Sequence, residues 1–179
     1  MIKEVLSYGH PVLRKKCSEV LKITDEIIAI ARDLEETVLY KNGAGLAAPQ
    51  IGYEKRMFVC CYENELDSKG LPILCNPKLY INPVLKNPSE TKDIKEEGCL
   101  SIPGIFSGVS RPCEVFIEAM TLEGNKFSEH ATGWKARCIF HENDHLNGVL
   151  FIDRLPQSKK KGMQKSLTNL KKKFKNSLK

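Results

Sequence analysis

Two histidines four residues apart, His141 and His145, offer the clearest chemistry in the chain. On a helix, residues i and i+4 project from the same face, so both imidazoles can bind one small metal ion. Glu142 then lies beside the ion, where its carboxylate can take a proton from a water on the metal. The same spacing also fits a core helix whose histidines hydrogen bond internally. We favour the interpretation of a hydrolytic metal site.

The neighbouring residues predict that this segment is helical and that it ends at Gly148, a residue typical of helix C-termini. Apolar bulk for one side of the helix comes from Ala136, Ile139, Phe140 and Leu146.

A catalytic site of this kind has three protein ligands and one open position. Downstream candidates are poor, because Phe151 stands where one class of zinc proteases has a third histidine. Asp153 is the only acid after Asp144 and is too close to His145 across the end of the helix. The third ligand is therefore expected upstream.

Two upstream cysteines could supply a thiolate. Cys138 lies on the same helical face as His141, but its short side chain is far from His145. Cys99 follows Gly98, which would let another backbone approach, and precedes Pro103, which is expected to end any strand. Cys99 is the better candidate. Its alternative role is that of a small buried apolar residue, as for most free cysteines.

Three segments together resemble the peptide deformylase family, in the order and at the spacings typical of it, over nearly the whole chain through Leu155. They are Gly43-Ala44-Gly45-Leu46-Ala47-Ala48-Pro49-Gln50, Glu97-Gly98-Cys99-Leu100-Ser101 and His141-Glu142-Asn143-Asp144-His145. One departure is Phe140, where the family often has Gln before the first metal-binding His.

The resemblance implies removal of the formyl group from the N-terminal formylmethionine of new polypeptides. Glu142 would be the general base and acid, while Gln50 and the Leu100 N–H would polarise the formyl carbonyl. The implied metal ligands are Cys99, His141 and His145. The peptide backbone would meet Ala44, Gly45 and Gly98, and the methionine side chain would enter an apolar pocket that includes Cys138.

Two imidazoles and one thiolate accept Zn(II), Fe(II), Ni(II) or Co(II), because geometry and supply matter as much as intrinsic affinity. The resemblance implies Fe(II) in the cell, with Zn(II) or Ni(II) in purified protein. Fe(II) beside a thiolate should be sensitive to oxygen.

The composition predicts one globular domain, because 179 residues with 41% hydrophobic content can bury a core. Seven cysteines without regular spacing, and a start without an apolar signal region, favour a reducing bacterial cytoplasm. No stretch is apolar enough for a membrane span, and DNA is not an expected partner. We expect an α+β fold with antiparallel or mixed β-sheets around the central metal-binding helix, plus an N-terminal and a C-terminal helix.

The N-terminal helix is predicted to begin at Thr24 or Asp25 and to end at residues 41–43. Its apolar face would contain Ile27, Ile28, Ala31, Leu34 and Val38. Strands are predicted at 56–61, 79–85, 115–120 and 126–130, the last two as a hairpin. Residues 63–76 read as a surface loop. Cys60 and Cys61 should point to opposite faces of the first strand.

Several single residues receive structural interpretations. Arg111 is expected to pair with Asp144 and to brace the metal helix against the Cys99 loop. Trp134 is expected in the core with one edge facing the pocket. Neither His10 nor His130 has the spacing of a ligand.

Residues 1–155 form the predicted catalytic domain, and 156–179 form a basic amphipathic helix of the same domain. The tail contains nine lysines and no acids, so the remaining 19 basic residues face 22 acids and the net +6 comes from the tail. Its apolar positions are Met163, Leu167, Leu170, Phe174 and Leu178. The alternatives are a solvated helix docked on the body, a contact with RNA phosphates, and an anionic membrane surface. The resemblance favours the ribosome.

Two other functions fit parts of the sequence. A zinc endopeptidase could use the same helix motif, although Phe151 and the acid-free C-terminus argue against it. A basic RNA- or ribosome-binding protein could contain the same metal in a purely structural role.

Overall fold

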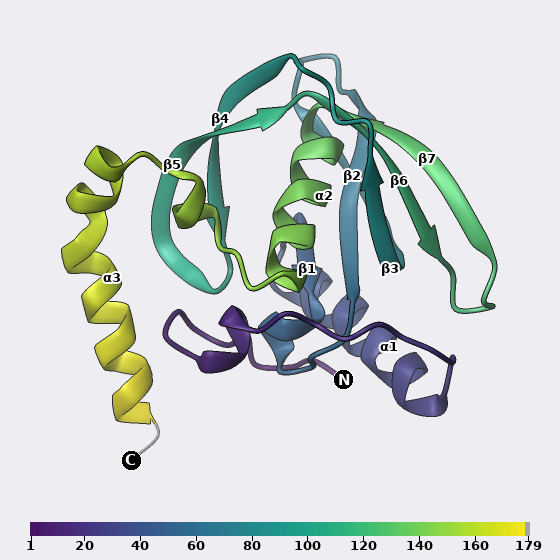
Figure 1. Cartoon of the computed structure of the whole chain (residues 1–179), viewed down its shortest axis with the longest axis horizontal. Helices are drawn as coiled ribbons and strands as arrows, with labels where there is room; N and C mark the ends of the chain where they lie inside the picture. The colour runs from purple at the N-terminus through teal and green to yellow at the C-terminus, as the bar shows by residue number, and fades with distance from the viewer. Residues whose placement is uncertain (178–179) are drawn as a thin grey trace.

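The computed structural model describes residues 1–177 and has the predicted α+β architecture (Figure 1). The helices are α1 (Asp25–Tyr40), α2 (Gly133–Leu146) and α3 (Gln157–Ser177), with short 3-10 helices at Pro11–Arg14, Ala48–Ile51 and Phe151–Arg154. An antiparallel five-stranded sheet has the order β1 (Gly45–Ala47), β2 (Met57–Leu66), β3 (Pro72–Lys86), β6 (Glu114–Met120) and β7 (Lys126–Thr132). A separate antiparallel pair consists of β4 (Lys92–Cys99) and β5 (Ile102–Pro112).

Helix α2 lies at the centre, between the five-stranded sheet and the β4–β5 pair (Figure 1). Its last residue is Leu146, and Gly148 follows with φ +69°. A Cβ at Gly148 would lie 2.5 Å from the Arg14 carbonyl oxygen. The predicted stop at Gly148 is confirmed, and it also allows the N-terminal segment to approach.

Helix α1 packs on the other face of the five-stranded sheet. Thr24 caps it as predicted, because its side chain accepts a hydrogen bond from the Ile27 N–H. Ile28 was wrongly assigned to the apolar face and is 39% exposed. The opposite orientation of the adjacent cysteines is confirmed, since Cys60 joins the apolar cluster beneath α2 and Cys61 the cluster beneath α1.

The predicted surface loop at 63–76 is wrong. β2 continues to Leu66 and β3 begins at Pro72, so this segment is a projecting β-hairpin. The Asp67 side chain organises its turn by accepting hydrogen bonds from the Lys69 and Leu71 N–H groups, both at 2.8 Å. Because this hairpin projects into solvent, its strands contain charged residues. The composition of residues 63–76 therefore resembled that of a loop.

The β4–β5 pair was not predicted. Pro103 was expected to end any strand, but it is the second residue of β5, a position where proline is tolerated. Gly98 was expected to allow the close approach of another backbone, and this prediction was also wrong. A Cβ there would lie 2.4 Å from the Phe106 ring, so an aromatic side chain, and not another backbone, makes the close approach.

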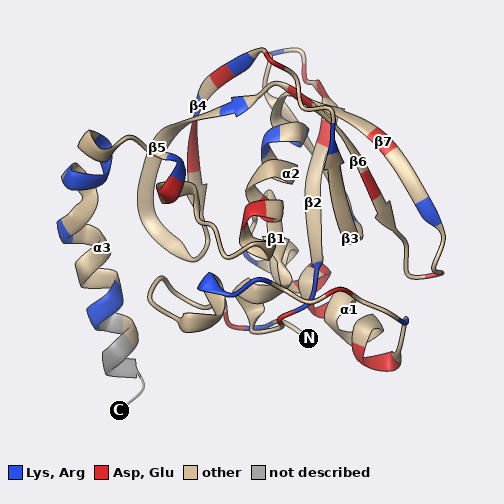
Figure 2. Ribbon diagram, in the orientation of Figure 1, with Lys and Arg blue, Asp and Glu red and all other residues tan. Residues whose placement is uncertain are grey.

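The predicted C-terminal helix is confirmed as α3, which lies beside β5 and the N-terminal segment (Figure 1). Leu167 is buried and Met163 and Leu170 are partly buried against the body. The predicted apolar position Leu178 lies outside the described residues. Lysines line the exposed side of α3 (Figure 2). No helix within residues 1–177 is both long and apolar enough to cross a membrane.

Candidate active site

Three potential metal donors converge from two parts of the fold. Cys99 is the last residue of β4, while His141 and His145 occupy successive turns of α2. The three donor atoms all lie within 4.8 Å of one another, and Cys99 Sγ is 3.3 Å from His145 Nε2. The structure therefore brings together the set predicted from sequence, and Cys138 is not part of it.

The surroundings of these donors suit a divalent cation. Glu97 Oε2 lies 3.0 Å from His141 Nδ1, which leaves His141 Nε2 free for an ion. Burial, reinforced by the nearby Glu142, raises the pKa of the Cys99 thiol to about 12. A thiolate at this partly buried position thus needs a compensating positive charge, which a bound metal ion supplies. One sulfur and two imidazole nitrogens suit a transition metal better than Mg²⁺ or Ca²⁺.

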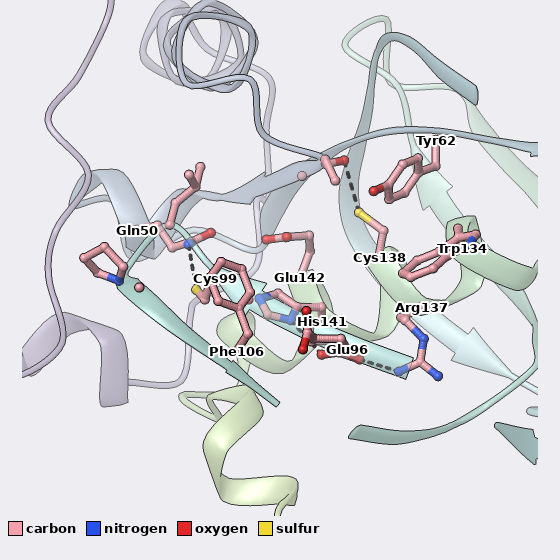
Figure 3. A pocket seen from close by; sticks show the side chains of 17 residues that line it. Gln50, Tyr62, Glu96, Cys99, Phe106, Trp134, Arg137, Cys138, His141 and Glu142 are labelled. Atoms are coloured by element: carbon pink, nitrogen blue, oxygen red, sulfur yellow. Dashed lines mark hydrogen bonds and ion pairs between the residues drawn. The ribbon is translucent and has the colours of Figure 1, made fainter. Parts of the chain in front are cut away.

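Glu142 lies beside the donors with its side chain buried (Figure 3). Burial raises the pKa of Glu142 well above its usual range, and Cys60 adds to this effect. Within residues 1–177, Glu142 Oε2 has no hydrogen-bond partner. Gly45 permits this placement, because a Cβ there would be 2.7 Å from Glu142 Oε1. A carboxyl group with a raised pKa and a free oxygen is suited to proton transfer.

Glu97 was missed by the sequence analysis and is the centre of an ion-pair cluster. It accepts hydrogen bonds from Arg111 at 2.7 and 2.9 Å and from Arg137 at 2.7 Å. Burial alone would raise the pKa of Glu97, but the bonds to His141 and Arg111 outweigh it and lower the pKa to about 2. The only sequence signal for this role was its place two residues before Cys99.

The predicted pair of Arg111 and Asp144 is confirmed, with Arg111 Nη1 2.8 Å from Asp144 Oδ2. Arg154 adds a second, unpredicted partner for Asp144. The cluster thus connects β4, β5 and α2, the three elements that supply or support the metal donors.

Gln50 lies in the 3-10 helix that follows β1 and is buried. Its Oε1 accepts a hydrogen bond from the Ala47 N–H at 2.8 Å, so the Nε2 group faces the site. Nε2 lies 3.2 Å from Ser101 Oγ and 3.5 Å from Cys99 Sγ. This orientation suits the predicted amide donor. Leu100, adjacent to Cys99, lines the cavity beside the donors, and the role of its N–H stays a prediction.

A cavity of about 390 Å³ extends from Gln50 and Cys99 to an aromatic end formed by Tyr62 and Trp134 (Figure 3). The Tyr62 and Trp134 rings lie 6.3 Å apart. The pocket-facing edge predicted for Trp134 is confirmed, but its predicted place in the core is wrong, because the side chain is only half-buried. Cys138 Sγ donates a hydrogen bond to the Ala44 carbonyl at 3.2 Å. The cavity is lined by all four predicted substrate-binding residues, Ala44, Gly45, Gly98 and Cys138, together with the unpredicted Glu96 and Phe106.

Residues excluded as ligands lie outside the donor cluster. His10 Nδ1 accepts a hydrogen bond from the Val12 N–H, and His130 pairs with Glu114 at 2.9 Å. Asp153 accepts hydrogen bonds from Arg14 and from the Leu150 N–H.

Comparisons with known proteins agree with this geometry. The sequence model of the family described as "Polypeptide deformylase" matches residues 2–161. A peptide deformylase of Pseudothermotoga lettingae is 41% identical over 170 residues, covering 95% of this chain and 92% of that protein. A peptide deformylase of Clostridium botulinum is 41% identical over 86% of this chain and 96% of its own length.

Solved structures give the same result. The crystal structure of peptide deformylase from Ehrlichia chaffeensis has a TM-score of 0.86 and 32% identity, with full coverage of both chains. That of peptide deformylase from Plasmodium falciparum has a TM-score of 0.85 and 33% identity over 97% of this chain and 98% of that one. Neither the endopeptidase nor the non-enzymatic alternative finds support in these similarities.

Proposed function

The chain belongs to the polypeptide deformylase family, and from this premise we propose a role for each residue of the site. The protein is a metal-dependent hydrolase that removes the formyl group from the N-formylmethionine of nascent polypeptides. The observation that supports our assignment most directly is the convergence of Cys99, His141 and His145 beside Glu142, which has a free oxygen.

Cys99, His141 and His145 would hold the metal. When bound, the ion polarises the formyl oxygen and lowers the pKa of a water to about 7. We propose Fe(II) in the cell, with Zn(II), Ni(II) or Co(II) able to replace it in purified protein, because the donor set does not discriminate among them.

The substrate would lie with its formyl group at the Gln50 end of the cavity and its methionine side chain toward Cys138 and the aromatic end. Ala44, Gly45 and Gly98 would offer main-chain groups to the peptide. These residues come from the facing segments that begin β1 and end β4, so an extended peptide fits between them.

Glu142 takes the proton from the attacking water and delivers it to the departing amine. Its raised pKa suits this role, because the group must hold a proton during the reaction. Negative charge collects on the formyl oxygen, where the Gln50 amide and the Leu100 N–H stabilise it. One such donor contributes about 3 kcal/mol to a transition state. Glu97 orients the His141 ring through Nδ1.

The test is formate release from formyl-Met-Ala by anaerobically purified, metal-loaded protein. We expect turnover that a chelator abolishes and that reloading with Fe(II) restores. N-acetylated peptides with internal bonds should remain uncut, whereas an endopeptidase would cleave them. An absence of formate from metal-replete protein would refute the assignment.

Helix α3 is proposed as a ribosome-binding element that belongs to the same domain as residues 1–155. Leu167 packs into the body's apolar cluster, while Lys161, Lys165 and Lys172 remain exposed. Such a cationic face can bind the phosphates of ribosomal RNA. We also propose the bacterial cytoplasm as the location, since nascent formylated chains are made there and all seven cysteines are free thiols.

Co-sedimentation with ribosomes tests this role of α3. We expect binding that weakens steeply with salt, and a triple Lys161→Gln, Lys165→Gln, Lys172→Gln variant that binds less while still releasing formate from formyl-Met-Ala. Unchanged sedimentation of the variant would refute the proposed contact.

A further inference from the structure

We propose that the β2–β3 hairpin beyond Tyr62 binds the part of the nascent polypeptide that follows the formylmethionine, as an extended segment with apolar side chains. The inference rests on the proposed placement of the substrate in the cavity. It adds a second, distal contact region to an enzyme whose chemistry takes place at the other end of the cavity.

The strand edges around the cavity lead toward this hairpin. β1 pairs with β2 only from Phe58 to Cys60, and the Ala44 carbonyl accepts one more hydrogen bond, from the Cys61 N–H at 2.8 Å. From Tyr62 to Leu66, the β1 side of β2 has no strand partner among the described residues. A peptide that leaves the cavity past Ala44 therefore meets an open strand edge, to which an extended chain can add.

Apolar side chains continue from the cavity onto the hairpin. Tyr62, which lines the cavity, lies directly opposite Leu74 in the β2–β3 ladder, and opposite residues share a face of the sheet. Leu74 is 59% exposed, and Leu66 and Leu71 at the tip are 52% and 56% exposed. We call these three leucines the hairpin patch. Exposed leucines beside an open strand edge are a binding surface or an aggregation hazard.

The base of the hairpin is fixed to the body. The Asn64 side chain donates to the His130 carbonyl and accepts from the Thr132 N–H, both at 3.0 Å, and this connects β2 to the end of β7. The hairpin can therefore offer a preformed surface. Glu63, Glu65 and Asp67 place three negative charges beside the patch against one positive charge from Lys69, so the surface should prefer apolar or basic segments and disfavour acidic ones.

The experiment compares kcat/KM for formyl-Met-Ala with that for a nine-residue neutral peptide that begins formyl-Met-Ala and continues with apolar residues. We expect wild type to favour the long peptide by about tenfold, the gain from burying one leucine-sized surface. A Leu66→Ser, Leu74→Ser variant should lose this gain and process formyl-Met-Ala at the normal rate. Normal turnover of the short substrate also shows that the variant folds.

Val84→Ser is the matched control, because Val84 is 51% exposed on β3 but lies outside the projecting segment 63–76. It should keep the preference for the long peptide. A second measurement needs no variant: replacing the distal residues of the long peptide by Glu should reduce its advantage with the wild-type enzyme.

Equal kcat/KM for short and long neutral peptides in the wild type would overturn the proposal. A variant that keeps the full preference for the long peptide would overturn it as well. Failure to release formate from formyl-Met-Ala is a different result, which refutes the proposed catalytic assignment and not the hairpin contact.

Discussion

Glu97 and Glu142 are two buried carboxyl groups next to the same histidine, His141, with exposed fractions of 6% and 4%. Glu97 has hydrogen bonds to two arginines and to His141, and its pKa falls to about 2. Among the described residues Glu142 Oε2 has no hydrogen-bond partner, and burial raises the pKa of Glu142 well above its usual range. Burial opposes ionisation in both, so the partners account for the difference.

The comparison separates two uses of a buried carboxylate. The arginine cluster around Glu97 fixes β4, β5 and α2 relative to one another. Removal of one partner leaves a buried charge unpaired and therefore lowers the stability of the fold. The incomplete hydrogen bonding of Glu142 is unfavourable for folding, but it leaves an oxygen available to the substrate and its water. Mutation should therefore affect stability at the first site and turnover at the second.

The largest expected effect is the loss of activity in Glu142→Gln. The amide keeps the shape of the side chain but cannot accept and return a proton, so formate release should fall about 10²- to 10⁴-fold. Stability should not decrease, because no ion pair is lost. Formate assays and thermal unfolding of the same sample measure both quantities.

The control for Glu142→Gln is Glu118→Gln, which removes an exposed carboxylate on β6 and should leave the rate unchanged. A Glu142→Gln enzyme that retains more than a tenth of wild-type activity would contradict the assigned role.

The next largest effect is expected for Arg111→Met. This change leaves Glu97 and Asp144 without their shared partner, and should lower the free energy of unfolding by about 3–5 kcal/mol. Urea unfolding of metal-free protein measures it. Lys86→Met breaks an exposed pair with Glu118, and should cost less than about 1 kcal/mol. Similar losses of unfolding free energy in the two variants would show that burial does not make the Arg111 ion pairs more important for stability than the exposed Lys86–Glu118 pair.

A smaller effect is expected for Glu97→Gln on metal affinity. Loss of the carboxylate that orients His141 should weaken binding by about 10- to 100-fold, measurable by competition with a chelator. Asp93→Asn is the control, because Asp93 pairs with Arg137 without contacting His141. If both variants bind metal equally well, orientation of His141 does not depend on Glu97.

The smallest effect concerns Asp153, a carboxylate that is partnered like Glu97 but exposed. Burial alone would raise its pKa, but Arg14 and the Leu150 N–H lower it below the usual range. A lowered folded-state pKa means that the carboxylate stabilises the protein above the unfolded pKa of about 3.9, and that this contribution is lost as the pH falls.

Because the Asp153 side chain is 38% exposed, Asp153→Asn should cost less than about 1 kcal/mol at pH 7. The difference from wild type should shrink as the pH falls from 7 through and below the unfolded pKa of about 3.9, as followed by urea midpoints across this range. A difference that stays constant with pH would rule out the ion pair as its source.

The sequence was informative where spacing within one element determined the outcome. The periodicity of α2 predicted that His141 and His145 share a face, and the structure places Cys99, the upstream candidate, within 4.8 Å of both. Arg111 and Asp144 could be paired because both were expected next to the site. The role of Glu97 could not be predicted, since its partners Arg137 and His141 are 40 and 44 residues away.

The β4–β5 pair was hidden for a related reason. Its inward side chains include Glu97 and Arg111. These charged residues can be buried because they form an ion pair with one another. Alternation of apolar and polar residues, the usual signal of a half-buried strand, is therefore absent there. In the β4–β5 pair, polar residues are buried. In the hairpin patch, by contrast, apolar leucines are exposed, so their presence in the sequence does not indicate a core.

The missing Cβ of Gly45 restricts how the enzyme could escape an inhibitor. Any larger residue at this position would collide with the side chains of Glu142 and Cys138, each 2.7 Å from the place where its Cβ would be. A compound that binds the main chain of Gly45 would thus contact a position where any substitution displaces Glu142, the proposed general base. We expect resistance to such a compound to arise elsewhere along the cavity wall.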